Sequence, residues 1–284
     1  SVVCLVISAY RYNVAEPWKH RSLSDRWACA PAVGPYQVIS TAQSLANHSF
    51  VKVLRHGQAE FVSATPKVVD YASGLCLLEL DPNELRAPLK PLRFPKTYAQ
   101  GEDVTCHWRS PSNGLNSGQA YLDRARVQGV RTSFGRRLRY VIANASRKMG
   151  IGELYCLGST PIGIGCWAGD NREADLIPSE TIARFLDAIN ADEAYPGFGE
   201  IGFASSELRD PAMRSFLQIP SAMRGGVYVA NVYKLGTGAD SLLKGDVILD
   251  IDGHAIDSYG RYADPSYGPL SMQHLITQKA AGQE

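Results

Sequence analysis

The sequence predicts a mainly β protein of two domains, and three observations carry that prediction. Most of the first 175 residues fall into short β-rich runs bounded by Gly, Pro, Asn and Asp, as in a barrel or a sandwich. Helical periodicity is clear in one stretch, 179–190, and the composition changes after it. A length of 284 residues suits two domains of about 100–200 residues each.

The predicted strands follow one another with short turns between them, up to residue 167. They cover 2–10, 35–41, 50–57, 59–69, 74–80, 103–108, 119–130, 138–144, 153–158 and 161–167. A helix then begins near Ser179, a plausible N-cap, with Ile182, Phe185, Leu186 and Ile189 on one apolar face.

The helix is followed by a stretch with the composition of a linker. We therefore expect a first domain at 1–192, a linker at 193–199 and a second domain at 200–284. The second domain is predicted to hold strands near 201–208, 225–233 and 246–253 and helices near 210–218 and 270–279.

The composition excludes several classes of protein. Lys and Arg total 29 against 28 Asp and Glu, and 45% of the residues are hydrophobic, which argues against disorder and bulk nucleic-acid binding. No apolar run approaches the roughly 20 residues of a membrane span. The six cysteines lie mostly in apolar runs, as buried small residues do, although one or two disulfides would fit an exported protein. Neither a CxxC pair nor zinc spacing occurs, so we expect no metal or cofactor.

The most specific pattern is the run 225–256, which resembles the core of a PDZ domain. A strand leads to a short turn ending at Leu243, then to Gly245-Asp246, a buried strand and the tight turn Asp252-Gly253. The resemblance implies binding of peptide or partner-protein C-termini by strand addition, with the terminal carboxylate held by backbone amides. The matching residues for a peptide-binding groove are Glu200, Ile201, Gly202, Phe203, Met272, Leu275 and Ile276. Core packing is the other interpretation of Ile201 and Phe203.

A β-rich domain, a helix and a PDZ-like domain together resemble the HtrA/Deg family of serine proteases. The resemblance rests on 39–45, 73–81 and 152–165 and covers essentially the whole chain. It implies a chymotrypsin-like double β-barrel followed by a PDZ domain. It also implies one more strand after residue 284 and an exported location: periplasmic, secreted or envelope-associated.

The same register implies that the catalytic triad is absent. The histidine position falls on Gln43, the aspartate position on Gly74 and the serine position on Gly150. A Gln amide is not basic, and Gly150 has no side chain to attack a carbonyl. We therefore expect a pseudoprotease that acts as a scaffold or adaptor. Two alternatives stay open: an active hydrolase with a relocated nucleophile such as Ser159 or Cys156, and a degenerate domain of a larger multi-domain protease.

Two further features suggest partners. The stretch 124–148 carries basic side chains and no acidic one, and would form a surface for an acidic partner if it is not simply a solvated face. Its basic residues are Arg124, Arg126, Arg131, Arg136, Arg137, Arg139, Arg147 and Lys148. Aromatic residues near the N-terminus, such as Trp18 and Trp27, suggest a homo-oligomer by resemblance alone. The histidines of the first barrel, His20, His48 and His56, lack the spacing of a metal pair.

Overall fold

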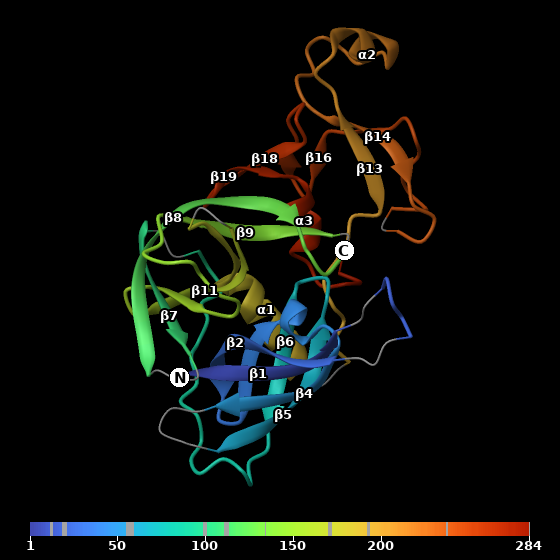
Figure 1. Ribbon diagram of the computed structural model, residues 1–284. Coiled ribbons are helices and arrows are strands. Elements are labelled where there is room, and N and C mark those ends of the chain that lie inside the picture. Colours follow the sequence, from blue (N-terminus) through green and yellow to red (C-terminus); the bar gives the residue numbers. More distant parts are fainter. Residues whose placement is uncertain are drawn as a thin grey trace. The chain divides into compact units, whose positions relative to one another are not determined.

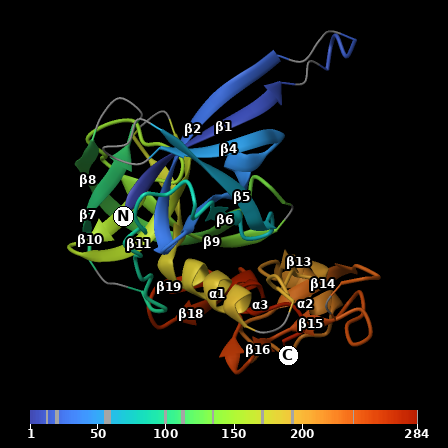
Figure 2. The same ribbon diagram turned by 90° about the horizontal axis from the view of Figure 1, so that it is seen from below.

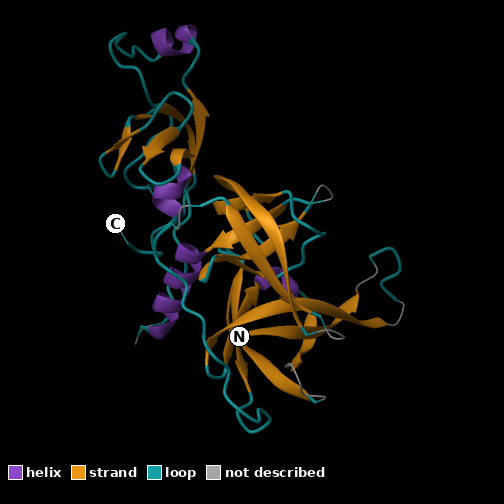
Figure 3. Cartoon of the chain, turned by 90° about the vertical axis from the view of Figure 1, so that its left-hand side faces the viewer, coloured by secondary structure: helices purple, strands orange, loops and turns teal. Residues whose placement is uncertain are grey.

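A computed structural model gives the fold of the chain, and it is mainly β as predicted (Figure 3). The structure describes residues 1–11, 14–18, 22–54, 60–98, 101–110, 114–133, 135–169, 172–191, 194–236 and 238–283. The strands close into two barrels, followed by a helix and by a smaller set of short strands and helices (Figure 1).

The first barrel is built from the first six strands. They are β1 (Val2–Arg11), β2 (Ser22–Gly34), β3 (Gln37–Thr41), β4 (His48–Leu54), β5 (Phe61–Asp70) and β6 (Leu75–Leu80), closed in the order β1-β2-β3-β6-β5-β4. Alternate residues of β1, namely Val3, Leu5 and Ile7, point into the barrel core. The 3-10 helix η1 (Ala42–Leu45) follows β3, and the Thr41 hydroxyl caps it by accepting from the Ser44 amide.

The second barrel repeats the architecture with six more strands. They are β7 (Asp103–Arg109), β8 (Leu115–Gly129), β9 (Arg136–Ala143), β10 (Leu154–Leu157), β11 (Thr160–Ala168) and β12 (Ala174–Pro178), in the order β10-β11-β12-β9-β8-β7. The helix α1 (Ser179–Asn190) follows β12, and Ile182, Ala183 and Phe185 form its buried face. The prediction that Ser179 is the N-cap is wrong. Pro178 occupies the N-cap position, and Ser179 is the first residue of the helix.

The chain divides into two compact units. The barrel unit comprises Ser1–Arg124, Arg131–Ser133 and Arg139–Tyr195. The C-terminal unit comprises 125–130, 134–138 and 196–284. The sequence alone did not indicate that segments of the β8–β9 hairpin cluster with the C-terminal unit.

The C-terminal unit combines three small sheets with two short helices. Its elements are β13 (Phe203–Glu207), α2 (Pro211–Phe216), β14 (Val227–Val232), β15 (Val247–Ile248), β16 (Asp250–Ile251), β17 (His254–Ala255), β18 (Arg261–Asp264), β19 (Gly268–Ser271) and α3 (Gln273–Thr277). The sheet order β13-β14-β15 leaves β13 at an edge. Asp252 and Gly253 both have positive φ in the turn between β16 and β17, which suits the predicted hairpin.

All six cysteines are free thiols, and five of them are buried. Burial raises the pKa of Cys4 and Cys156 to about 11 and that of Cys29 and Cys76 to about 12. These thiols are therefore protonated at neutral pH and pack as small apolar groups. Within the described residues, no helix has the length and apolar character needed to cross a membrane.

Candidate functional site

The three positions that the HtrA/Deg resemblance assigns to a catalytic triad come together in the barrel unit, although they are far apart in sequence. Gln43 lies on η1, and the neighbouring Ala42 amide donates to the Gly74 carbonyl at 2.8 Å. Gln43 also lines a hollow of about 620 Å³ together with Met149 and Ile151, which flank Gly150. The remaining lining residues of this barrel hollow are Arg131, Cys166, Trp167, Ala168, Gly169 and Glu173.

The loop that carries Gly150 is held against the first barrel by its backbone. The Cys29 amide donates to the Ile151 carbonyl at 2.9 Å, and Gly152 donates to the Gly165 carbonyl at 2.7 Å. Gly152 has a φ of +73°, and a Cβ there would lie 1.9 Å from the Cys29 carbonyl oxygen. Only glycine fits this close approach of two backbones.

A buried carboxylate lies beside Gly150. A Cβ added at position 150 would come within 2.6 Å of Glu153 Oε1. The Glu153 side chain is 5% exposed and forms an ion pair with Arg147. Its other oxygen, Oε2, accepts from the Cys106 thiol at 3.2 Å. Sequence reasoning missed this group, because nothing in the pattern of 152–165 distinguishes Glu153 from an exposed residue.

The Arg147 guanidinium completes this arrangement by stacking on the Trp108 ring, 3.7 Å from its centroid. Burial and the Glu153 carboxylate both raise the pKa of the Cys106 thiol, so it stays protonated and donates to that carboxylate. The Glu153 carboxylate beside Gly150 is thus ion-paired with Arg147 and hydrogen-bonded to the Cys106 thiol. Gly150 itself has no side chain that could act as a nucleophile.

The two alternative nucleophiles have no activating partner in the part of the chain that the structure describes. Cys156 lies on β10 and is buried, with a pKa of about 11. Ser159 lies in the exposed turn between β10 and β11. Neither the thiol nor the hydroxyl is hydrogen-bonded to a histidine or a carboxylate among the described residues, as an activated nucleophile requires.

The basic stretch 124–148 does not form one continuous surface. Arg137 and Arg139 are each 2% exposed, and Arg139 donates to the Ser73 carbonyl at 2.9 Å. Both were expected on a partner surface, but β9 is buried on both faces over most of its length. Of the other arginines expected on this surface, Arg124, Arg131 and Arg136 are exposed and Arg126 is half-buried.

Histidines do not gather into a site in the described chain. His20 and His56 lie outside the described residues, and the ring Nδ1 of His48 lies 2.7 Å from the Leu45 carbonyl oxygen. Among the described residues, no group of three or more His, Cys, Asp or Glu side chains is placed to hold a metal ion.

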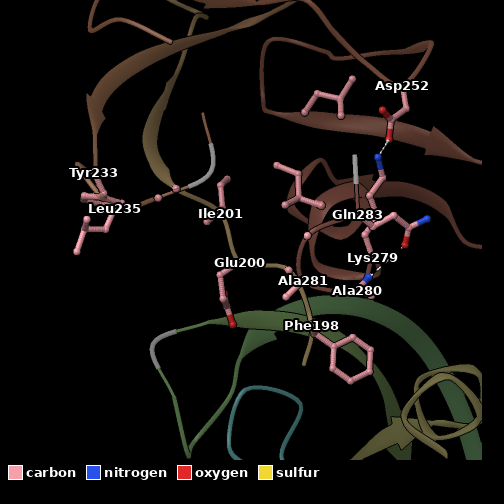
Figure 4. Close-up of a pocket in the computed structure, with 16 residues that line it drawn as sticks. Phe198, Glu200, Ile201, Tyr233, Leu235, Asp252, Lys279, Ala280, Ala281 and Gln283 are labelled. Carbon is pink, nitrogen blue, oxygen red and sulfur yellow. Dashed lines mark hydrogen bonds and ion pairs between the residues drawn. The ribbon is translucent and has the colours of Figure 1, made fainter. Parts of the chain in front are cut away.

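The C-terminal unit contains a hollow of about 780 Å³, which we call the loop hollow. Four of the predicted groove residues line it: Glu200, Ile201, Gly202 and Ile276. Figure 4 shows Ile201, Tyr233 and Leu235 on one side of this loop hollow and the Lys279–Asp252 ion pair on the other. Phe203, Met272 and Leu275 are instead part of the core of the unit and are at most 5% exposed. These three residues belong to the elements that form the hollow, but their side chains point into the core and do not line it.

The backbone at the mouth of the loop hollow is suited to an anion. Tyr233 donates to the Gly202 carbonyl at 2.9 Å, whereas in the described chain the amides of Ile201 and Gly202 make no hydrogen bond. Gly236 packs so closely that a Cβ there would lie 2.5 Å from the Gly202 Cα. The loop therefore holds its shape while two neighbouring N–H groups stay available to a ligand.

Arg137 holds the loop at 198–200 in place. Its side chain is 3% exposed, is paired with Glu200 at 2.5 Å, and donates to the carbonyls of Gly199 at 2.9 Å and Thr277 at 3.3 Å. Its guanidinium also lies 5.7 Å from the Phe198 ring centroid. Arg137 thus contacts both the loop at 198–200 and the end of α3. Sequence reasoning placed it on a surface because its partners are more than 60 residues away.

Known proteins resemble the chain along its full length. No family model matches it. Do-like 13 of Arabidopsis thaliana is 23% identical over 287 residues, covering 100% of this chain and 58% of the relative. The mitochondrial protease Do-like 4 of the same plant is 20% identical over 272 residues, covering 94% of this chain and 52% of the relative. The chain therefore spans about half the length of the curated relatives it matches.

Solved structures of HtrA-type proteases share the fold. The protease AlgW with a tripeptide covers 99% of this chain and 86% of its own length, at a TM-score of 0.68 and 18% identity. AlgW with a decapeptide gives a TM-score of 0.67 at 16% identity, covering 99% and 88%. The chain is a homologue of the HtrA/Deg serine proteases.

A further solved protease structure matches about two thirds of the chain. The active form of the Rv3671c protease of M. tuberculosis covers 68% of this chain and 82% of its own length, at a TM-score of 0.53 and 20% identity. Together with the two closed barrels (Figure 2), this likeness agrees with the trypsin-like double β-barrel that the HtrA/Deg resemblance implied.

Proposed function

We propose that this HtrA/Deg homologue is a pseudoprotease, whose barrel unit is a scaffold and whose C-terminal unit is a PDZ domain that binds peptide or protein C-termini. The observation that carries the first half is position 150. It has no side chain, and the neighbouring Glu153 carboxylate lies where one would project. Gln43 and Gly74 add no base and no carboxylate to orient one.

Peptide binding rests on the loop hollow and on the adjoining edge of β13. An extended peptide could add to the free edge of β13, with its terminal carboxylate at the amides of Ile201 and Gly202. Ile201 and Ile276 would contact its last apolar side chain. The AlgW structures contain peptides, and we extend peptide binding to this chain as part of the proposal.

The absence of catalysis is tested with unfolded casein and a fluorophosphonate probe. We expect no hydrolysis and no labelling by the full chain, because Gly150 has no side chain to attack a carbonyl and Gln43 is not basic. Ser159→Ala and Cys156→Ala should leave both readouts unchanged. Casein hydrolysis that disappears in either variant would contradict the proposal and identify a relocated nucleophile.

Peptide binding is tested with a pair of peptides that end in the same apolar residue, one with a free carboxylate and one amidated. We expect the amide to bind at least about tenfold more weakly, since it lacks the charge that the loop amides would hold. Ile201→Arg should weaken the free-acid peptide, whereas Leu243→Arg, at an exposed leucine of the same unit, should not. Phe203 is unsuitable for this test because it is a core residue. Equal affinity for acid and amide would refute the carboxylate mode.

A further inference from the structure

A second groove lies on the C-terminal unit, with none of its lining residues in common with the loop hollow. It has a volume of about 520 Å³ and is lined by Met223, Arg224, Gly225, Leu249, Ala255, Ile256, Asp257, Arg261, Tyr262, Ala263 and Pro269. We call it the hairpin groove, because the β18–β19 hairpin forms one of its walls. Ile256 and Tyr262 are buried beneath it, whereas Met223 and Leu249 are each 37% exposed.

The opposite wall is a loop that the protein holds in place. Arg214, from α2, donates to the carbonyls of Leu208 at 3.2 Å and Gly225 at 3.4 Å, and also to that of Met223. The Gly226 amide donates to the Ile256 carbonyl at 2.8 Å, and a Cβ at Gly225 would lie 2.4 Å from that oxygen. These contacts set the loop at a fixed distance from the strand segment it faces.

One edge of β18 faces this groove. Within the described residues, β18 pairs with β19 alone. The backbone of Arg261 points away from β19, since its carbonyl accepts from the Asp257 amide at 2.8 Å and its amide donates to the Asp257 carboxylate. Backbone direction alternates along a strand, so Ala263, two residues on, presents its N–H and C=O on the same side. Ala263 lines the groove and is exposed.

The charge at the rim is positive. Asp257 accepts from the amides of Tyr259 and Arg261 and from Arg261 Nε, at 2.8–3.2 Å, so its charge is matched within the protein. Arg224 is exposed and makes no ion pair with any carboxylate of the described chain. A ligand with a negative charge next to an apolar residue would complement Arg224 and the exposed Met223 and Leu249.

We propose that the hairpin groove binds an extended, acidic segment of a partner protein, which adds as a strand to β18 at Ala263. An acidic side chain of the segment lies against Arg224, and a neighbouring apolar side chain lies over Met223, Leu249 and Pro269. The recognition uses the chain interior of the ligand rather than its end. It is therefore independent of the carboxylate mode proposed for the loop hollow.

The test uses the full chain and two synthetic peptides blocked at both ends. One is acetyl-Leu-Glu-Val-Asp-Leu-amide, and the other carries Lys in place of Glu and Asp. Blocked ends remove the terminal carboxylate, which is the group that the loop hollow is proposed to bind. We expect the acidic peptide to bind, to shift the amide resonance of Ala263, and to bind at least about tenfold more tightly than the Lys peptide.

Two variants and two controls complete the experiment. Ala263→Pro removes the edge N–H at a position where an edge strand tolerates proline, and Arg224→Glu reverses the rim charge. Each should weaken the acidic peptide by about tenfold or more. Lys244→Glu, at an exposed lysine of the same unit, and Ile201→Arg should leave its affinity unchanged. No binding of the acidic peptide, equal affinity for the Lys peptide, or a loss confined to Ile201→Arg would overturn the proposal.

Discussion

Arg137→Met is expected to destabilise the C-terminal unit and to weaken C-terminal peptides. The Gly199 and Thr277 carbonyls both accept from the Arg137 guanidinium, and the substitution removes this donor from both. Each buried unsatisfied group costs about 1–3 kcal/mol. Glu200 is 42% exposed, so its carboxylate can turn to water and adds less. We expect a loss of about 2–4 kcal/mol of local opening free energy.

The measurement is hydrogen exchange at the amides of β13, together with the affinity for a free-acid peptide. Arg136→Met is the matched control. Arg136 is the neighbour of Arg137 in β9 and is exposed, so its substitution should change neither value. Arg137→Lys keeps the charge but lacks the planar fork that reaches several acceptors at once, so we expect it to behave almost as the Met variant does. Unchanged protection of β13 in Arg137→Met would show that Arg137 does not position the loop.

Gly152→Ala is expected to destabilise the barrel unit more than any surface substitution. Its Cβ would lie 1.9 Å from the Cys29 carbonyl oxygen and 2.9 Å from Ser40 Oγ, in a residue whose φ is +73°. A backbone atom cannot move aside as a side chain can, so the clash adds to the cost of about 1–3 kcal/mol for a left-handed residue. We expect a total of at least about 4 kcal/mol in the free energy of unfolding.

The matched control for this second prediction is Gly158→Ala. Gly158 has a φ of +58°, and a Cβ there would meet nothing within 4 Å, so it isolates the cost of the backbone conformation. We expect about 1 kcal/mol for it in the same urea titration. If both variants lose the same amount, the close approach of Gly152 to Cys29 contributes nothing.

Much of the fold could be predicted because its strands carry local signals. Apolar runs between turn residues indicated ten of the twelve barrel strands, and the spacing of Ile182 and Phe185 indicated α1. The strands β2 (Ser22–Gly34) and β12 (Ala174–Pro178) were not predicted. The β18–β19 hairpin was missed, since its sequence contains Pro265, Gly268 and Pro269 and is typical of a loop.

The sites were harder to predict because their contacts join distant segments. The register placed Gln43, Gly74 and Gly150, and the fold brings these three positions together. No local pattern indicates that Arg137 would be buried against Thr277, or that Glu153 would be paired beside Gly150. Likewise, Phe203 and Met272 were expected to face a ligand, but tertiary packing turned them into the core.

The carboxylate beside Gly150 also limits which side chains position 150 can accept. Gly150→Ser by itself would place a Cβ 2.6 Å from Glu153 Oε1. To make room, the Glu153 carboxylate would have to shift within a buried site while it is paired with Arg147 and accepts from the Cys106 thiol. Gly150→Ser alone is therefore expected to lower the stability of the barrel unit. A library that varies positions 150 and 153 together is therefore expected to yield stable variants with serine at position 150, which substitutions at position 150 alone should not.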